Sequence, residues 1–523
     1  MPPIACAFFA ALLTATAVHA APPPDVDAYV GQAMSAFGAP GLSLAIVENG
    51  ATVLAKGYGV RRLGDAARVD AHTAFPIGSE SKAFTAAALA ILVDRGKLTW
   101  DDKVVDRLPG FAMYDTYSTA HMTVRDLLTH RSGLGLGEGD LLVIPGTSRT
   151  RADIVHALRY LPPKTGFRER FAYDNILYIV AGALVEAVSG QSWEDFVRAN
   201  IFSPAGMADA GFTPDAANGV ALHARTSGPI RGEGPQAVLP EPPGFGVIAP
   251  AGGVNASASD MARWMAVMLK GGVLPGGIRL FSQAQADELW RPVVVVPADE
   301  FKLPPAMAGM APDLQDYALG WFVESYRGHI VVEHSGAVFG ALAMLYLIPE
   351  EHVGIAVEIN SEDSGTRRAV MFHLLDHYLG LPPTDWIGRL RTARAGLIAQ
   401  AQAALKAAPA PVAGGAAGLP LAAYAGRYAD PWYGAMTVSR VSGGALRIRF
   451  DQTPGMEGTL EPLGGQRFRT RWRDRNIEDA YVDFTVAGDT VQSVKMNAIS
   501  PLADFSFDYQ DLNFTPATRP PGR

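Results

Sequence analysis

Ser79 and Lys82 stand three residues apart at the start of a long apolar run, and together they could carry out acyl transfer. This spacing sets a hydroxyl and an amine one turn apart on the same face of a helix. A neutral amine can take the proton that a serine hydroxyl does not release unaided at pH 7. Backbone N–H groups at the start of a helix can also stabilise an oxyanion. The pattern alone is not specific, because a helix start with an exposed lysine gives the same letters.

Two further patterns carry side chains that could complete such a site. Tyr173 and Asn175 lie where a loop turns into a helix, so that a phenol could relay a proton and an amide could orient the lysine or a substrate carbonyl. His334, Ser335 and Gly336 follow at the end of a strand. They offer a ring that titrates near neutral pH, a hydroxyl, and a residue whose backbone a ligand can approach closely. Each pattern alone is more typical of a helix cap or a structural histidine.

Together, the three patterns resemble the serine β-lactamase and penicillin-binding protein superfamily, in which Ser-x-x-Lys carries the nucleophile. The similarity extends over about residues 25–375 and includes family-like segments at residues 77–82, 127–134, 203–207 and 252–254. The Tyr-x-Asn pattern is similar to that of class C β-lactamases, D-aminopeptidases and family VIII-type esterases. Class A enzymes have Ser-Asp-Asn instead.

This resemblance implies a role for each residue of the patterns. Ser79 is the acylated nucleophile, Lys82 its base, and Tyr173 the group that passes the proton to and from the leaving group. Asn175 positions the lysine and the substrate amide. The oxyanion hole is implied to be the backbone N–H groups of Ser79 and Ala337.

One departure from the family narrows the expected substrate. β-Lactamases and cell-wall peptidases usually carry a lysine where this chain has His334, which with Ser335 and Gly336 is expected to contact the substrate. A neutral histidine holds a carboxylate less well than a lysine does. The esterase and peptide-hydrolase branches accept histidine there, so these activities are favoured over penicillinase or D-alanyl-D-alanine carboxypeptidase activity.

The elements that must position these residues follow an order typical of an α/β (α+β) fold. Two β-rich runs, 42–47 and 51–60, are joined at Asn49-Gly50, which is a strong hairpin signal. Helical patterns then dominate, and the sequence predicts helices at 83–95, at 175–188, after Ser192 and after Ser259. Strands are predicted again at 317–326, 329–334, 341–348 and 353–359. We therefore expect one antiparallel sheet flanked by helices with an inserted helical subdomain, the β-lactamase/transpeptidase-like arrangement that the resemblance implies.

A change of texture divides the chain into domains. We expect a catalytic domain at 25–380, a helix and an Ala/Pro/Gly-rich linker at 384–419, and a small all-β barrel at 420–523. Residues 505–509 are included among its predicted strands. The barrel loosely resembles the lipocalin-like module of exported peptidases of the superfamily, which implies loops that reach the active site and restrict it to small substrates. The alternative is a stabilising or dimerising appendage.

The N-terminus predicts export. Residues 1–20 have the apolar core and small final residues of a signal peptide cleaved after Ala20, and Pro22-Pro23-Pro24 would end any continuing helix. A buried N-terminal helix is the alternative. The single cysteine, Cys6, lies within this segment, so the mature chain is expected to contain no thiol. We expect a periplasmic or secreted protein.

Composition excludes several classes of partner. The net charge of −8 argues against nucleic-acid binding, and no later apolar run has the length of a membrane span. No metal-ligand spacing is present, so neither a metal nor another cofactor is expected. The expected partner is a small molecule or short peptide, and a homo-oligomer through the C-terminal domain is a further expectation.

These observations predict an exported serine hydrolase that cleaves amide or ester bonds through a Ser79 acyl-enzyme. The substrates expected are short peptides, peptides containing D-amino acids, or small esters. A β-lactamase or D-alanyl-D-alanine carboxypeptidase is one alternative. A non-catalytic peptide- or cell-wall-binding protein of the same fold is another.

Overall fold

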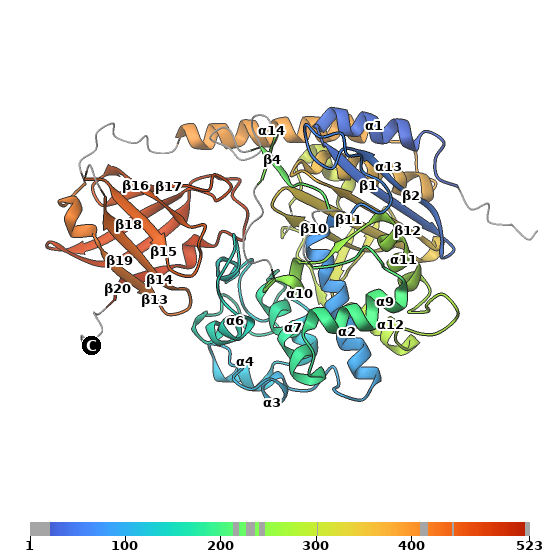
Figure 1. Ribbon diagram of the computed structural model, residues 1–523, viewed down its shortest axis with the longest axis horizontal. Helices are drawn as coiled ribbons and strands as arrows, with labels where there is room; N and C mark the ends of the chain where they lie inside the picture. Colours follow the sequence, from blue (N-terminus) through green and yellow to red (C-terminus); the bar gives the residue numbers. More distant parts are fainter. Residues whose placement is uncertain are drawn as a thin grey trace, which may run out of the picture.

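The computed structural model describes residues 21–212, 219–225, 236–239, 246–300, 302–407, 417–441 and 444–517. A mixed α/β region and a β-barrel lie beside each other in Figure 1, with α14 running along the upper edge of the view. The predicted signal peptide lies outside the described residues, as does the middle of the predicted linker, 408–416.

One antiparallel sheet, whose strand order differs from the chain order, forms the centre of the α/β region. Its eight strands run in the order β2-β1-β12-β11-β10-β9-β8-β7, and neighbouring strands are antiparallel. The predicted N-terminal hairpin therefore joins the C-terminal meander through the pairing of β1 with β12. The strands are β1 (Gly41–Glu48), β2 (Ala51–Gly59), β7 (Val294–Val295), β8 (Leu314–Tyr317), β9 (Phe322–Tyr326), β10 (His329–Val338), β11 (Ala341–Ile348) and β12 (Val353–Ile359).

Helices cover both faces of this sheet, because its central strands are apolar on both sides. In β1, Leu42, Leu44 and Ile46 face the core formed with α1, α13 and α14. The alternate residues Ala45 and Val47 face the core formed with α2 and α11. The bounds of these helices are α1 (Val26–Phe37), α2 (Ser81–Asp94), α11 (Ala258–Leu269), α13 (Ser364–Tyr378) and α14 (Trp386–Ala407).

The inserted helical subdomain packs against α2, as Figure 1 shows. Its longest helix, α7, ends at Gly190 in the left-handed conformation, at the predicted stop. The helices and helical turns between α2 and α11 are α3 (Val104–Arg107), α4 (Thr116–His121), α5 (Val124–Leu127), η2 (Asp140–Leu142), α6 (Arg151–Ala157), η3 (Leu158–Tyr160), α7 (Ile176–Ser189), α8 (Trp193–Val197), η4 (Arg198–Phe202), α9 (Ser203–Ala205) and α10 (Ala249–Gly252).

Most predicted elements agree with the structure to within one or two residues, and three boundaries differ for a clear physical reason. The helix expected after Ser259 begins at Ala258, because Ser257 caps it. The strand expected at 317–326 is two strands, β8 and β9, separated by a turn in which Gly320 has a φ of 82°. The strand expected to end at His334 continues to Val338, so that residue lies inside β10.

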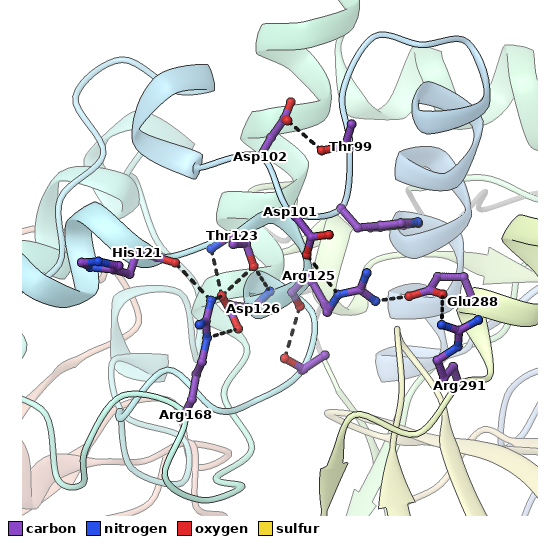
Figure 2. A network of polar contacts seen from close by, with 12 residues as sticks. Thr99, Asp101, Asp102, His121, Thr123, Arg125, Asp126, Arg168, Glu288 and Arg291 are labelled. Atoms are coloured by element: carbon purple, nitrogen blue, oxygen red, sulfur yellow. Dashed lines mark hydrogen bonds and ion pairs between the residues drawn. The ribbon is translucent and has the colours of Figure 1, made fainter.

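A polar network centred on Asp126 fastens the subdomain loops that lead to the site (Figure 2). The carboxylate of Asp126 caps α5 by accepting the Thr123 backbone N–H at 2.9 Å. It also accepts Nε–H groups from Arg131 at 3.0 Å and from Arg168 at 2.9 Å. Asp126 is buried and its ion pairs lower its pKa against the effect of burial. One carboxylate therefore ties the loop after α5 to the loop that precedes residue 173.

The C-terminal region is a closed antiparallel barrel whose strand order follows the chain, which confirms the predicted up-and-down barrel. The strand predicted at 505–509 is wrong. Asp504 accepts the backbone N–H of Ser506 at 3.0 Å, and this local bond turns the chain away from an extended path. The strands are β13 (Gly426–Asp430), β14 (Gly434–Arg440), β15 (Leu446–Phe450), β16 (Glu457–Gly464), β17 (Arg467–Trp472), β18 (Ala480–Ala487), β19 (Thr490–Ala498) and β20 (Asn513–Pro516).

Within the described ranges, no helix by itself has both the length and the apolar character needed to cross a membrane. Residues Ile176–Ser189 and Trp193–Ala205 meet that requirement only as a pair, and they are bent by 76°.

Candidate active site

The turn that carries Ser79 touches the strand β10, and two glycines make this contact possible. Ser79 lies in the 3₁₀ turn η1 (Gly78–Glu80) directly before α2, and Gly78 has a φ of 53°. A Cβ on Gly78 would lie 2.5 Å from the backbone nitrogen of Ala337. A Cβ on Gly336 would lie 1.8 Å from the carbonyl oxygen of Ile77. Only glycine allows the two backbones this approach, which brings together the segments predicted to supply both oxyanion donors.

The end of β10 is available for this contact because its pairing is one-sided. The register with β9 ends at Glu333, whereas the register with β11 continues to Val338. The segment 334–338 therefore turns one edge toward the nucleophile turn. This edge is local, because β10 lies in the interior of the sheet order.

A second segment holds the turn from the other side. Ser81 donates its hydroxyl to the Gly78 carbonyl at 2.7 Å and accepts the Val254 N–H at 3.0 Å. The Ile77 N–H donates to the Val254 carbonyl at 3.0 Å. The sequence segment 252–254 therefore fixes the nucleophile turn through backbone and side-chain bonds.

Lys82 is fully buried and its amine faces three oxygen atoms. Nζ lies 3.0 Å from Ser79 Oγ, 2.7 Å from Asn175 Oδ1 and 3.0 Å from the Ala251 carbonyl oxygen. A neutral amine has two protons and one lone pair. The amide oxygen and the carbonyl can accept only, so they take both protons. The lone pair is then directed at the Ser79 hydroxyl, which is the arrangement that a general base requires.

The pKa values indicate that Lys82, and not Tyr173, is the base. Burial lowers the pKa of Lys82 from 10.5 to about 7, and the nearby carboxyl groups of Asp140 and Asp174 oppose this change. Burial raises the pKa of Tyr173 above its ordinary value, and a hydrogen bond with Ser79 opposes that rise. At neutral pH the lysine therefore exchanges a proton readily, while the phenol stays protonated and can only relay one.

Asn175 is fixed between the lysine and a buried carboxyl group. Its Oδ1 accepts from Lys82, and its Nδ2 donates to Asp140 Oδ2 at 2.8 Å. Sequence patterns did not identify Asp140, which lies in a glycine-rich stretch at the start of η2. Burial raises the pKa of Asp140 to about 6, while hydrogen bonds from Ser506 and Asn175 lower it.

His130 holds the segment that carries Tyr173. Its carbonyl accepts the Ala172 N–H at 2.8 Å, and its Nδ1 accepts the Asp174 N–H at 3.2 Å. The centroids of the His130 and Tyr173 rings are 4.2 Å apart. Burial keeps the pKa of this histidine well below its usual value, so the ring acts as a neutral support. The motif at 127–134 contained His130, but only the fold shows this contact.

His334 is also a neutral, buried ring. Its Nδ1 lies 2.8 Å from the Ser335 carbonyl and its Nε2 lies 3.2 Å from the Tyr317 hydroxyl. Burial lowers its pKa to about 3. Both ring nitrogens are thus engaged within the protein. Ser335 is half-buried on the same strand.

Ser79, Asn175 and Ala337 line a cavity of about 340 Å³ that both domains enclose. The barrel supplies part of the wall through the loop between β19 and β20, and Phe505 of this loop packs edge-on against the Tyr173 ring, 6.1 Å between centroids. Gly336 and Lys82 are buried and do not line the cavity. The remaining lining residues are Ile144, Ile248, Ala251, Gly252, Val338, Phe339, Leu342, Glu362, Leu502, Asp504 and Ser506.

Buried acidic groups surround the underside of the nucleophile turn. Glu80 and Glu358 are buried, and burial raises the pKa of both, that of Glu358 to about 8. Arg367, also buried, donates to the Gly336 carbonyl at 3.3 Å and to the Ala343 carbonyl. Because the Gly336 carbonyl and the N–H of the next residue belong to one peptide group, this guanidinium fixes the orientation of that N–H.

In the described ranges, no group of three or more His, Cys, Asp or Glu side chains is arranged to hold a metal ion.

Two family models match the chain. Residues 26–380 match the model described as Beta-lactamase, and residues 410–516 match a domain of unknown function (DUF3471). Among curated relatives, the unguisins hydrolase ungD of Aspergillus violaceofuscus is 28% identical over 477 residues, covering 85% of this chain and 82% of the relative. Penicillin-binding protein 4 of Amycolatopsis lactamdurans is 30% identical over 331 residues, covering 61% of this chain and 81% of the relative.

Solved structures share the fold. The octameric penicillin-binding protein homologue from Pyrococcus abyssi has a TM-score of 0.58 at 22% identity, covering 91% of this chain and 98% of that one. The crystal structure of SurE has a TM-score of 0.53 at 21% identity, covering 94% and 98% of the two chains. At these sequence identities, both similarities show a shared fold and nothing more.

Proposed function

Because the chain belongs to the beta-lactamase family of serine hydrolases, we propose that it hydrolyses amide or ester bonds of small substrates through a Ser79 acyl-enzyme. The observation that carries the proposal is the contact of 3.0 Å between Lys82 Nζ and Ser79 Oγ, in a setting that leaves the amine lone pair for the hydroxyl. A relative named as a hydrolase aligns across both domains, which supports catalysis over a binding role.

The proposed reaction has two halves. Ser79 Oγ attacks the substrate carbonyl while its proton passes to neutral Lys82. The N–H groups of Ser79 and Ala337 stabilise the oxyanion, and loss of one such donor typically slows a reaction ~10²–10³-fold. The proton then reaches the leaving amine or alkoxide through Tyr173, and the C–N or C–O bond breaks. Water attacks the acyl-enzyme by the same route, releasing the acid and restoring the Ser79 hydroxyl.

Charge in the cavity favours substrates that carry a free amine near the scissile bond. Asp504 lines the cavity, and no lysine or arginine does so among the described residues. His334, where related enzymes carry a lysine, has a pKa of about 3 and bears no charge. At the His334 position a substrate carboxylate would meet a neutral ring in place of a lysine, which disfavours β-lactams and D-alanyl-D-alanine peptides. Short peptides with a free amino terminus fit this charge pattern.

A phosphonate probe tests the catalytic part of the proposal. Incubation of the full chain with a fluorescent phosphonate should label the wild type on Ser79, and the Ser79→Ala variant should stay unlabelled. An unlabelled wild type, or equal labelling of both proteins, would contradict the proposal.

A substrate panel tests the substrate class. We expect aminoacyl anilides with a free amine to be cleaved faster than their N-acylated counterparts, with nitrocefin a poor substrate. p-Nitrophenyl esters report acylation without regard to charge, and D- and L-aminoacyl anilides report stereochemical preference. Faster turnover of nitrocefin than of the free-amine anilides would favour a β-lactamase.

We also propose, on the sequence alone, that the protein is exported after cleavage at Ala20. Sequencing of the mature amino terminus tests this, since a chain that retains residues 1–20 contradicts it. Assembly into a homo-oligomer through the barrel is a separate proposal, and light scattering of the purified protein measures it directly.

A further inference from the structure

The loop between β19 and β20 grips the catalytic domain at Asp140. Ser506 Oγ donates to Asp140 Oδ2 at 2.7 Å, and both side chains are buried. The buried carboxyl group of Asp508 accepts the Gly139 N–H at 2.7 Å and the Leu141 N–H at 2.9 Å. The barrel therefore holds this residue by its side chain and by the backbone on either side.

The Asp140 oxygen that accepts from Ser506 also belongs to a chain of hydrogen bonds that leads to the Lys82 amine. Asp140 Oδ2 accepts from Asn175 Nδ2 at 2.8 Å, and Asn175 Oδ1 accepts from Lys82 at 2.7 Å. A flipped amide would place its oxygen against the carboxyl group and its NH₂ against the amine, losing both bonds. The carboxyl group thus determines the orientation of the amide, and Ser506 fixes the carboxyl group.

We propose that Ser506, supplied by the C-terminal barrel, is a positioning residue for Lys82, so that the docked barrel completes the geometry of the base. This inference rests on the proposed function. It assigns the barrel a part in the chemistry, which is different from limiting the size of substrates.

The electrostatic consequence has a definite sign. The Ser506 hydroxyl lowers the pKa of Asp140, and without it this pKa rises and the carboxyl group carries less charge near neutral pH. A less charged Asp140 stabilises protonated Lys82 less, so the pKa of Lys82 falls below its value of about 7. The ionisable groups that face these two residues, among those described, are Asp174, Asp504, Asp508, Tyr173, Tyr178, His130 and His334.

The test compares Ser506→Ala, Ser506→Thr and a control, Ser500→Ala, in the full-length protein. Ser500 lies in the same loop, where its hydroxyl accepts the Leu502 N–H at 3.2 Å. The measurement is the rate of phosphonate labelling of Ser79 from pH 5 to 9. We expect Ser506→Ala to lower the plateau rate about tenfold, as loss of a hydrogen bond to an ionised group predicts. The acid limb of the pH–rate profile, where the labelling rate rises with pH, should also shift to lower pH.

Ser506→Thr keeps a hydroxyl and should restore both the plateau and the limb, and Ser500→Ala should match the wild type. A wild-type plateau and limb in Ser506→Ala would overturn this inference alone. So would a lower plateau with an unshifted limb, or an equal loss in Ser500→Ala, because either result is that of a merely structural role. An unlabelled wild type would instead overturn the proposed function and this inference with it.

Discussion

At the scale of single residues, the site separates a base from a relay by the surroundings of each. Lys82 and Tyr173 both approach Ser79, yet burial moves their pKa values in opposite directions. The protonated forms of an amine and a phenol differ in charge, so the same apolar environment favours the neutral form of each. The amine becomes a base near neutral pH and the phenol remains a donor.

The pKa of Lys82 predicts how acylation depends on pH. Because its folded-state value is lowered to about 7, the amine is neutral above that pH, and the labelling rate of Ser79 should rise through a midpoint near pH 7. Lys82→Met should lower the rate ~10²–10⁴-fold and remove this limb. Lys56→Met, at an exposed lysine paired with Asp27, is the control and should behave as the wild type. A wild-type profile in Lys82→Met would exclude it as the base.

At the scale of elements, the contact between the nucleophile turn and β10 depends on missing side chains. Gly336→Ala places a methyl group against the Ile77 carbonyl, where the 1.8 Å distance forces the backbones apart. We expect the acylation rate to fall ~10²–10³-fold through loss of an oxyanion donor. Gly31→Ala, on the exposed face of α1 where a Cβ would meet nothing within 4 Å, is the matched control.

Circular dichroism should show that Gly336→Ala remains folded, so that the loss is assigned to the site. A folded Gly336→Ala protein with wild-type kcat would show that the oxyanion hole does not need this close approach.

The buried acids beneath the turn predict a stability that falls with rising pH. The pKa of Glu358 is raised to about 8 in the folded protein against an ordinary value of 4.5, so the folded state binds more protons between these values. Its contribution is complete below about pH 4.5 and is lost as pH rises toward 8, at up to about 1.4 kcal/mol per pH unit.

Glu358→Gln mimics the protonated form and should flatten this dependence. Denaturant unfolding of both proteins at pH 5.5 and pH 8 measures the free energy of unfolding. The variant should gain on the wild type at the higher pH. An equal change in both proteins between the two pH values would rule out the titration of Glu358 as its source.

At the scale of the whole molecule, the barrel forms a wall of the active site. Phe505 lines the cavity and packs against Tyr173, so Phe505→Ala should widen the cavity and raise kcat/KM for bulky acyl substrates relative to small ones. Tyr160→Ala removes an aromatic ring of similar exposure that does not line the cavity, and should leave the ratio unchanged. An unchanged ratio in Phe505→Ala would count against gating by this loop.

The sequence predicts contacts between residues that are close along the chain, and it does not predict contacts between residues that are far apart along it. Ser79 and Lys82 meet because a helical turn places them together, and the hairpin at Asn49 follows from its own turn residues. Ser506 and Asp140 are 366 residues apart, and only the docking of two folded domains makes them neighbours.

Local sequence patterns also could not predict which side chains of the site are buried. The motif position of His334 predicts a substrate contact. The fold buries the ring and pairs Nε2 with the Tyr317 hydroxyl and Nδ1 with the Ser335 carbonyl. The 505–509 stretch alternates like a strand, and the bond from Asp504 overrides that alternation.

The grip of Asp508 and Ser506 on the η2 turn also sets an order of events during biosynthesis. A ribosome delivers the chain from its amino end, and domains fold largely in that order. The sheet, the nucleophile turn and the amine can therefore assemble while Ser506 and Asp508 have still to be translated. A nascent polypeptide at that stage holds the reactive hydroxyl without the support behind its base, and we expect it to react more slowly until the final loop has been made and has docked.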